Sequence, residues 1–151
     1  MRRFVLDTGV VGAYLRNAPI WQRMAAEHRL LEDDAMLIVS VVSWGELFSI
    51  AQINQWGQPK QRKLSSLLET LYVVDIAHAD EQLIADYCAL DAFSRNALQH
   101  KPLPNGSRKM GKNDLWIGAT AKTAQAELIT MDGDFDHLHG HYLTVHKYPP
   151  K

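Results

Sequence analysis

The sequence predicts an α/β layer sandwich built around a five-stranded parallel sheet. Five short apolar runs alternate with longer segments in which apolar residues recur at helical spacing. The run 36–39 is apolar at every position, which is typical of a strand buried on both faces of a parallel sheet. The chain of 151 residues shows no internal repeat and no linker, so we expect a single domain over residues 1–151.

The first half of the chain shows a strand followed by two helices, twice over. Pro19 suits the first turn of a helix, and the segment 43–46 (SWGE) fits the S-x-x-E capping box that opens one. The leucines between residues 64 and 71 share one helix face. The predicted elements are, in order, a strand at 4–6, helices at 10–16 and 19–32, a strand at 36–39, and helices at 46–55 and 60–71.

The second half continues this alternation but is interrupted by an irregular segment, 95–112. Its two prolines and its Asn105-Gly106 turn are typical of a loop. Asn113 is a good N-cap, and Asp114 a good first-turn residue, for the helix that follows. The predicted elements are a strand at 72–76, helices at 78–98 and 113–122, and strands at 128–130 and 143–148.

The single cysteine and the short apolar runs favour a cytoplasmic protein. Cys88 cannot form an intrachain disulfide, which fits a reducing compartment, and its place among periodic apolar residues predicts a buried structural thiol. The run at 4–6 stops at Asp7, too early for a signal peptide. No apolar run is long enough to cross a membrane, so we expect no membrane contact.

Acidic residues follow several of the predicted strands or open the helices beside them. Asp7 ends the first strand, Glu46 and Asp114 open helices, and Asp132 and Asp134 follow the fourth strand. Because residues after parallel strands converge at one edge of the sheet, we expect these carboxylates to meet. Crowded carboxylates repel unless a cation holds them, and oxygen ligands favour Mg²⁺ or Mn²⁺ over Zn²⁺. The alternative for Glu46 and Asp114 is a purely structural role in helix capping.

The irregular segment 95–112 is strongly cationic. The whole chain has 16 basic and 17 acidic residues, a net charge of −1, so any contact with nucleic acid must depend on a local patch. This segment precedes Asp114 directly, which predicts positive charge beside the acidic site, where phosphates of a nucleic acid would bind; the alternative is a solvated surface loop. Its cations are Arg95, Lys101, Arg108, Lys109 and Lys112.

Two further patterns are weaker. Residues 106–113 come within one residue of the nucleotide-binding pattern G-x-x-x-x-G-K-[ST], but Asn113 lacks the hydroxyl and the proline-rich segment 101–104 cannot form the strand that precedes such a loop. Nucleotide binding therefore remains a less favoured alternative. The alternating histidines of 137–141 (HLHGH) do not fit one helix face and have no cysteine beside them, so we expect exposed turn residues rather than a zinc site.

Four segments, taken in order, resemble the PIN-domain family. They are 4–8 (FVLDT), 43–47 (SWGEL), 113–121 (NDLWIGATA) and 130–135 (TMDGDF), and within the family they look most like the small VapC-type toxins of bacterial toxin–antitoxin pairs. The chain departs from these toxins at Gly9, where they usually carry Ser, and at Gly118, where they usually carry Ala. Neither change removes a carboxylate, although Gly118 implies lower local helix stability.

The resemblance implies a three-layer α/β/α sandwich and a metal-dependent endoribonuclease that hydrolyses RNA phosphodiester bonds. It further implies a small antitoxin protein that plugs the site, and a homodimer. Its metal ligands and catalytic residues would be Asp7, Glu46, Asp114 and Asp132, with Asp134 as a spare ligand and Thr8, Asn113 and Thr130 in support. The alternative is a PIN-like module that binds RNA or protein without cutting.

Overall fold

A five-stranded parallel sheet in the order β3-β2-β1-β4-β5 forms the centre of the molecule. The computed structural model describes residues 1–149. All pairings along the sheet are parallel, and Phe4 of β1 aligns with Leu37 of β2 and Glu127 of β4. The strands are β1 Arg2–Leu6, β2 Ala35–Ser40, β3 Tyr72–Val74, β4 Glu127–Thr130 and β5 Val145–Lys147.

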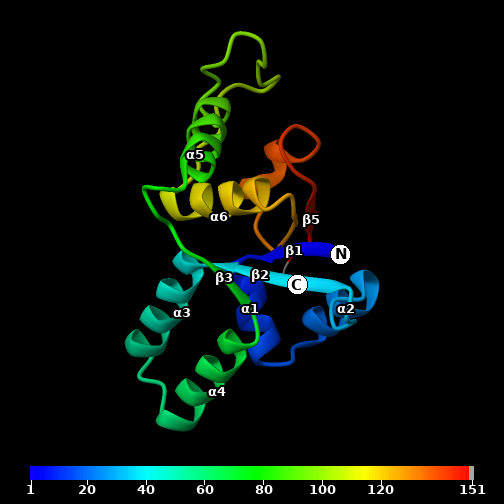
Figure 1. Ribbon diagram of the computed structural model, residues 1–151, viewed down its shortest axis with the longest axis vertical. Helices are drawn as coiled ribbons and strands as arrows, with labels where there is room; N and C mark the ends of the chain where they lie inside the picture. The colour runs from blue at the N-terminus through cyan, green and yellow to red at the C-terminus, as the bar shows by residue number, and fades with distance from the viewer. Residues whose placement is uncertain (150–151) are drawn as a thin grey trace.

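Helices cover both faces of the sheet. Figure 1 shows α1 to α4 on one side of the sheet and α5 and α6 on the other. The predicted three-layer α/β/α sandwich is therefore confirmed. The helices are α1 Thr8–Leu15, α2 Pro19–His28, α3 Val41–Ile53, α4 Gln58–Glu69, α5 Glu81–Ser94 and α6 Lys112–Thr123, with a 3-10 helix η1 at Gly133–Leu138.

Two separate clusters of buried side chains explain why the central strands are apolar throughout. Phe4 and Leu6 of β1 pack in the cluster that includes α1, α2 and α4. Val5, between them, packs with residues of α5 and α6 on the other face. Because side chains alternate along a strand, a strand covered on both faces needs apolar residues at odd and even positions alike.

Two predicted helix starts were wrong because a residue further upstream provides the cap. Ser40 caps α3 by accepting a hydrogen bond from Val42 N at 3.2 Å, so the S-x-x-E segment lies inside the helix. The helix α6 begins earlier than predicted, at Lys112, with Gly111 as its N-cap residue. Asn113 is therefore not a cap, while Asp114 is confirmed as a first-turn residue.

The helices α2 and α5 are shorter than predicted, and Cys88 on α5 faces solvent instead of the core. The helix α2 ends at His28, where Arg29 adopts a left-handed conformation with φ 50°. Cys88 is exposed, so the predicted buried thiol was wrong. It lies two residues after the buried Asp86, and two residues on a helix are about 200° apart.

Within residues 1–149, no helix combines the length and the apolar character that a membrane crossing requires.

Candidate active site

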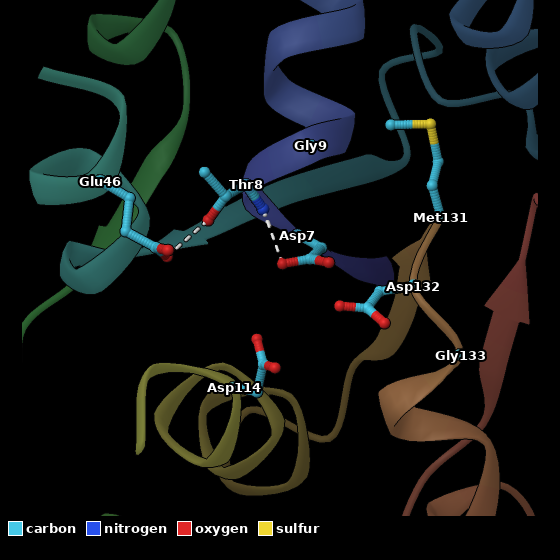
Figure 2. A pocket seen from close by; sticks show the side chains of 8 residues that line it. All are labelled: Asp7, Thr8, Gly9, Glu46, Asp114, Met131, Asp132 and Gly133. Carbon is cyan, nitrogen blue, oxygen red and sulfur yellow. Dashed lines mark hydrogen bonds between the residues drawn. The ribbon is translucent and has the colours of Figure 1, made fainter. Parts of the chain in front are cut away.

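One pocket at the carboxyl edge of the sheet collects four carboxylates from four separate segments. Its volume is about 370 Å³. Asp7 follows β1, Glu46 lies on α3, Asp114 lies in the first turn of α6, and Asp132 follows β4. Figure 2 shows the carboxylates of Asp7, Asp114 and Asp132 facing one another, with Glu46 at the side near Thr8. The structure thus brings together, in this pocket, four of the five acidic residues singled out in the sequence.

Asp7 is the most deeply placed of these groups, at 8% exposure. Both of its carboxylate oxygens accept a hydrogen bond, Oδ1 from Thr8 N at 2.8 Å and Oδ2 from Thr130 Oγ1 at 2.7 Å. Burial raises the pKa of Asp7, and the charges of Asp132 and Glu46 raise it further, while the two hydrogen bonds oppose this rise. The side chain is therefore fixed in orientation but costly to ionise.

Thr130, at the end of β4, connects Asp7 to the acidic turn that follows. Its hydroxyl donates to Asp7 and accepts a hydrogen bond from Asp132 N at 2.9 Å. Asp132 in turn caps η1, since its Oδ1 accepts from Asp134 N at 2.9 Å. The turn from Thr130 to Asp134 is thereby held in register with β1 across the sheet.

Thr8 and Ser43 hold Glu46, and sequence reasoning missed the part played by Ser43. Thr8 Oγ1 donates to Glu46 Oε1 at 2.9 Å and lies 2.8 Å from Ser43 Oγ, which is fully buried. Ser43 and Glu46 are three residues apart on α3, so they share a helix face directed at Thr8. The same S-x-x-E spacing that suggested a capping box therefore positions a carboxylate instead.

Asp114 shows most clearly that the pocket is short of positive charge. Burial, followed by the charges of Asp7, Asp132, Asp134 and Glu46, raises the pKa of Asp114 to about 7. Carboxylate oxygens of Asp114, Asp132 and Asp134 lie within 4.8 Å of one another. Carboxylate oxygens are the ligands that Mg²⁺ and Mn²⁺ prefer, so the donor set fits such a cation. Asp134 therefore joins the cluster as a candidate ligand.

Asn113 lies outside the acidic pocket. It lines a neighbouring depression together with Glu46, Val42 and Ile50 of α3. It is neither the N-cap residue of α6 nor a lining residue of the main pocket. Its expected orienting role is not supported by any hydrogen bond within residues 1–149.

The cationic segment is separate from the acidic pocket. Figure 1 shows that the loop between α5 and α6 extends beyond the end of α5, away from the sheet. Arg95, Arg108 and Lys109 line a different hollow, where Arg95 pairs with Asp91 at 2.8 Å. Lys101 Nζ lies over the ring of Tyr142, 4.4 Å from its centroid.

The histidine run and the 106–113 segment form neither of the sites considered for them. His139 and His141 are exposed, as predicted, whereas His137 is half-buried with Nε2 2.7 Å from Ser94 Oγ. Over residues 1–149, the side-chain grouping that has metal-binding spacing is acidic and contains no histidine. Residues 101–111 form no strand, so the segment lacks the strand-loop-helix order of a phosphate-binding loop.

The fold and the pocket define a class: an α/β protein with an all-carboxylate site at the carboxyl edge of a parallel sheet. Residues 4–140 match the family model of the PIN domain, so the chain belongs to the PIN domain family. This match and the solved structures described next confirm the fold that the sequence predicted.

Relatives with established names or structures cover most of the chain. Ribonuclease VapC1 from Haemophilus influenzae (strain R2866) is 29% identical over 129 residues, which is 84% of each chain. VapBC-1 from nontypeable Haemophilus influenzae has a solved chain that is 24% identical, with a TM-score of 0.72, over 96% of this chain and 97% of that one. A toxin–antitoxin complex from Klebsiella pneumoniae contains a chain that is 21% identical, with a TM-score of 0.61 and coverage of 97% and 98%.

Proposed function

We propose that this protein is a divalent-metal-dependent endoribonuclease and the toxin of a toxin–antitoxin pair. The observation that carries the proposal is the convergence of four carboxylates in one pocket, those of Asp7, Glu46, Asp114 and Asp132. No lysine or arginine is among the described residues that line this pocket. Membership of the PIN domain family and the similarity to Ribonuclease VapC1 support the same activity. RNA is the proposed substrate, and its phosphodiester bond the bond that is hydrolysed.

The pocket would hold Mg²⁺ or Mn²⁺ through the close group Asp114, Asp132 and Asp134, with Asp7 and Glu46 completing the oxygen shell. When bound, such a cation activates water and neutralises the negative charge that develops on the phosphodiester. Coordination by Asp114, Asp132 and Asp134 would oppose the mutual repulsion that, after burial, raises the pKa of Asp114 to about 7. The proposal therefore predicts that cation binding releases a proton near neutral pH.

The protein's own contribution is to keep the carboxylates oriented before substrate arrives. Thr130 and the backbone of Thr8 fix both oxygens of Asp7, and the Thr8 hydroxyl holds Glu46. These partners of the ligating groups set ligand direction and basicity, which is how residues one step removed from a metal control its affinity. A carboxylate of the pocket that does not ligate the cation could also accept a proton from the attacking water.

We place the RNA backbone along the cationic loop between α5 and α6, where Arg108 and Lys109 are exposed, and past the exposed Lys112 at the start of α6. The antitoxin and the homodimer are also proposals. The similarity to a chain from a toxin–antitoxin complex supports the antitoxin. A small protein encoded beside this gene should copurify with the chain and stop its RNA cleavage.

Cleavage of labelled RNA in the presence and absence of metal tests the proposal. We expect cleavage with Mg²⁺ or Mn²⁺, no cleavage with EDTA, and a rise in melting temperature when either ion is added. Full cleavage in EDTA would contradict the metal-dependent mechanism. Tight RNA binding with no cleavage under any metal would favour the alternative, a PIN-domain module that binds without cutting.

A further inference from the structure

The acidic pocket has one apolar wall, and it belongs to a residue that the metal site does not use. Of the described residues that line the pocket, Met131 alone has an apolar side chain longer than a methyl group; the others are acids, glycines and Thr8. Met131 is partly exposed and lies between Thr130 and Asp132. The residue also packs against the core cluster on the α1 face of the sheet, so only part of its side chain is open to a molecule that enters the pocket.

The direction of Met131 separates it from the carboxylates. Successive side chains in an extended segment point to opposite sides, and Asp132 points toward Asp7 and Asp114. Figure 2 shows the Met131 side chain running the other way, toward the first turn of α1 at Gly9. The pocket thus has an acidic part, suited to a phosphate with its cation, and directly beside it an apolar surface formed by Met131, which we call the apolar shoulder.

Gly9 makes room for this shoulder. A Cβ atom at residue 9 would lie 3.1 Å from Met131 Cε, closer than ordinary van der Waals contact, so any larger residue there would displace the methyl group by a few tenths of an ångström. The pairing gives a physical reason for Gly9 at a position where similar toxins usually carry Ser. The absence of a side chain at residue 9 lets the Met131 methyl group lie against α1 without this displacement.

We infer that Met131, kept in place by Gly9, is the surface on which the base next to the scissile phosphodiester rests. The inference depends on the proposed ribonuclease activity, because it places the phosphate among the carboxylates. Each phosphodiester in RNA links two nucleosides, so a base lies on either side of the scissile bond. Sequence-selective contacts require such a base to be unstacked, as in single strands and loops. A methionine sulfur contacts aromatic rings favourably but offers no directional hydrogen-bond pattern.

This chemistry sets both the substrate class and the form of the selectivity. The substrate is single-stranded or loop RNA, since a paired base cannot reach the shoulder. Selectivity comes from contact area rather than from base edges, so purines are favoured over pyrimidines at the flanking position by a modest factor. Met131 is thus a residue that determines specificity, and Gly9 is a positioning residue that acts through it.

The test compares cleavage of an RNA pool randomised around one unpaired cut site by wild type, Met131→Ala, Gly9→Ser and the double variant. We expect Met131→Ala to reduce the purine-to-pyrimidine ratio to about one and to raise KM for the purine substrate by about two- to tenfold. The effect should fall on KM more than on kcat, because the base contact exists before and during the reaction. Met36→Ala, at a partly buried methionine of β2 outside the pocket, is the matched control and should keep the wild-type ratio.

The Gly9 variants test the coupling. Gly9→Ser should shift the base ratio in the same direction by a smaller factor, and it should add nothing further in the Met131→Ala background. Additive effects of the two substitutions would overturn the role of Gly9.

A second readout is the affinity of each variant for a non-cleavable RNA analogue, measured with Mn²⁺ by fluorescence anisotropy. We expect weaker binding of purine-flanked analogues by Met131→Ala and unchanged affinity for Mn²⁺ itself. An unaltered base ratio in an active Met131→Ala enzyme would overturn the inference and leave the ribonuclease proposal intact. A wild-type protein that cuts no RNA with any metal would overturn both.

Discussion

Two buried carboxylates on opposite parts of this chain have opposite electrostatic surroundings. Asp7 is 8% exposed and Asp86, on α5, is 3% exposed. Burial alone would raise the pKa of Asp86, but hydrogen bonds from Lys122, Thr123 and Gln82 outweigh it and lower that pKa. Asp7 has hydroxyl and amide donors too, yet its pKa is raised, because its burial is the larger effect and its charged neighbours are other acids.

The difference is whether the protein supplies the counter-charge itself. Lys122 Nζ lies 2.9 Å from Asp86 Oδ1, and this contact joins α5 to the last turn of α6. No lysine or arginine among residues 1–149 pairs with Asp7, Asp114 or Asp132. A buried carboxylate with an internal cation is kept in its charged form by the fold itself, whereas crowded carboxylates without one require a cation from solution.

The largest expected effect is the loss of cleavage in Asp7→Asn. The amide keeps the shape of the side chain and removes one of the converging charges, so RNA cleavage should fall by at least about 100-fold, the loss typical of removing one preorganised electrostatic group. The metal-free protein should melt at the same temperature or higher, because like charges repel less. Cleavage assays beside thermal melts with and without Mg²⁺ measure both; a folded Asp7→Asn protein that cuts at the wild-type rate would contradict the site.

Thr130 and Thr123 each donate a hydroxyl hydrogen bond to a buried carboxylate, so the substitutions Thr130→Val and Thr123→Val form a matched pair. Thr130→Val removes the donor 2.7 Å from Asp7 Oδ2, so cleavage or metal affinity should fall by about 10- to 100-fold. The control is Thr123→Val, which removes the donor 2.7 Å from Asp86 Oδ2 and should leave cleavage unchanged. Equal losses of cleavage in the two variants would show that the hydroxyls act only through stability.

Asp86→Asn should damage stability and spare function. Lys122, 30% exposed, would be left without its charged partner, and the free energy of unfolding should fall by about 1–3 kcal/mol. Urea unfolding measures the decrease, and cleavage per folded molecule should match wild type. A collapse of cleavage in folded Asp86→Asn would mean that the α5–α6 contact also sets the position of Asp114.

The pH dependence of stability should have opposite signs at the two sites. The pKa of Asp114 is raised from 3.8 to about 7, so its stabilising effect is present at pH below about 4 and is lost as pH rises toward 7. The lowered pKa of Asp86 gives the reverse, stability present at neutral pH and lost in acid. In EDTA, Asp114→Asn should therefore be more stable than wild type at pH 8 and lose this advantage at pH 4; an advantage of the same size at both pH values would contradict the charge cluster.

The smallest expected effect concerns the cationic loop. Replacing Arg108 and Lys109 together by Ala should weaken RNA binding and reduce the log–log salt slope by about one unit for each phosphate that the loop no longer neutralises. Arg95→Ala is the internal comparison, since Arg95 is already paired with Asp91 and should change the slope less. An unchanged slope in the double variant would make the loop an ordinary solvated surface.

The sequence alone determined the fold class and the set of acidic residues that meet. Apolar runs such as 36–39 need burial on both faces, which implies a parallel sheet under two helical layers. Asp7 comes directly after one strand of that sheet and Asp132 two residues after another, so their convergence follows from topology. The N-cap residue of α3 could not be predicted in this way, because Ser40 and Ser43 are both good cap residues. The pairing of β2 with β3 ends at Ser40, so Ser40 becomes the cap.

Tertiary packing decided what the local pattern left open. Cys88 shares an apolar stretch with Leu83 and Leu90, but only the docking of α5 on α6 determines which side of the helix is buried. Gly118 shows the same dependence, since a Cβ atom there would lie 3.1 Å from Leu90 Cδ1. The pKa of Asp114 likewise depends on its burial and on charges carried by other elements of the fold, which no local spacing encodes. Periodicity predicts which residues can be buried, and the packing of one element on another decides which of them are.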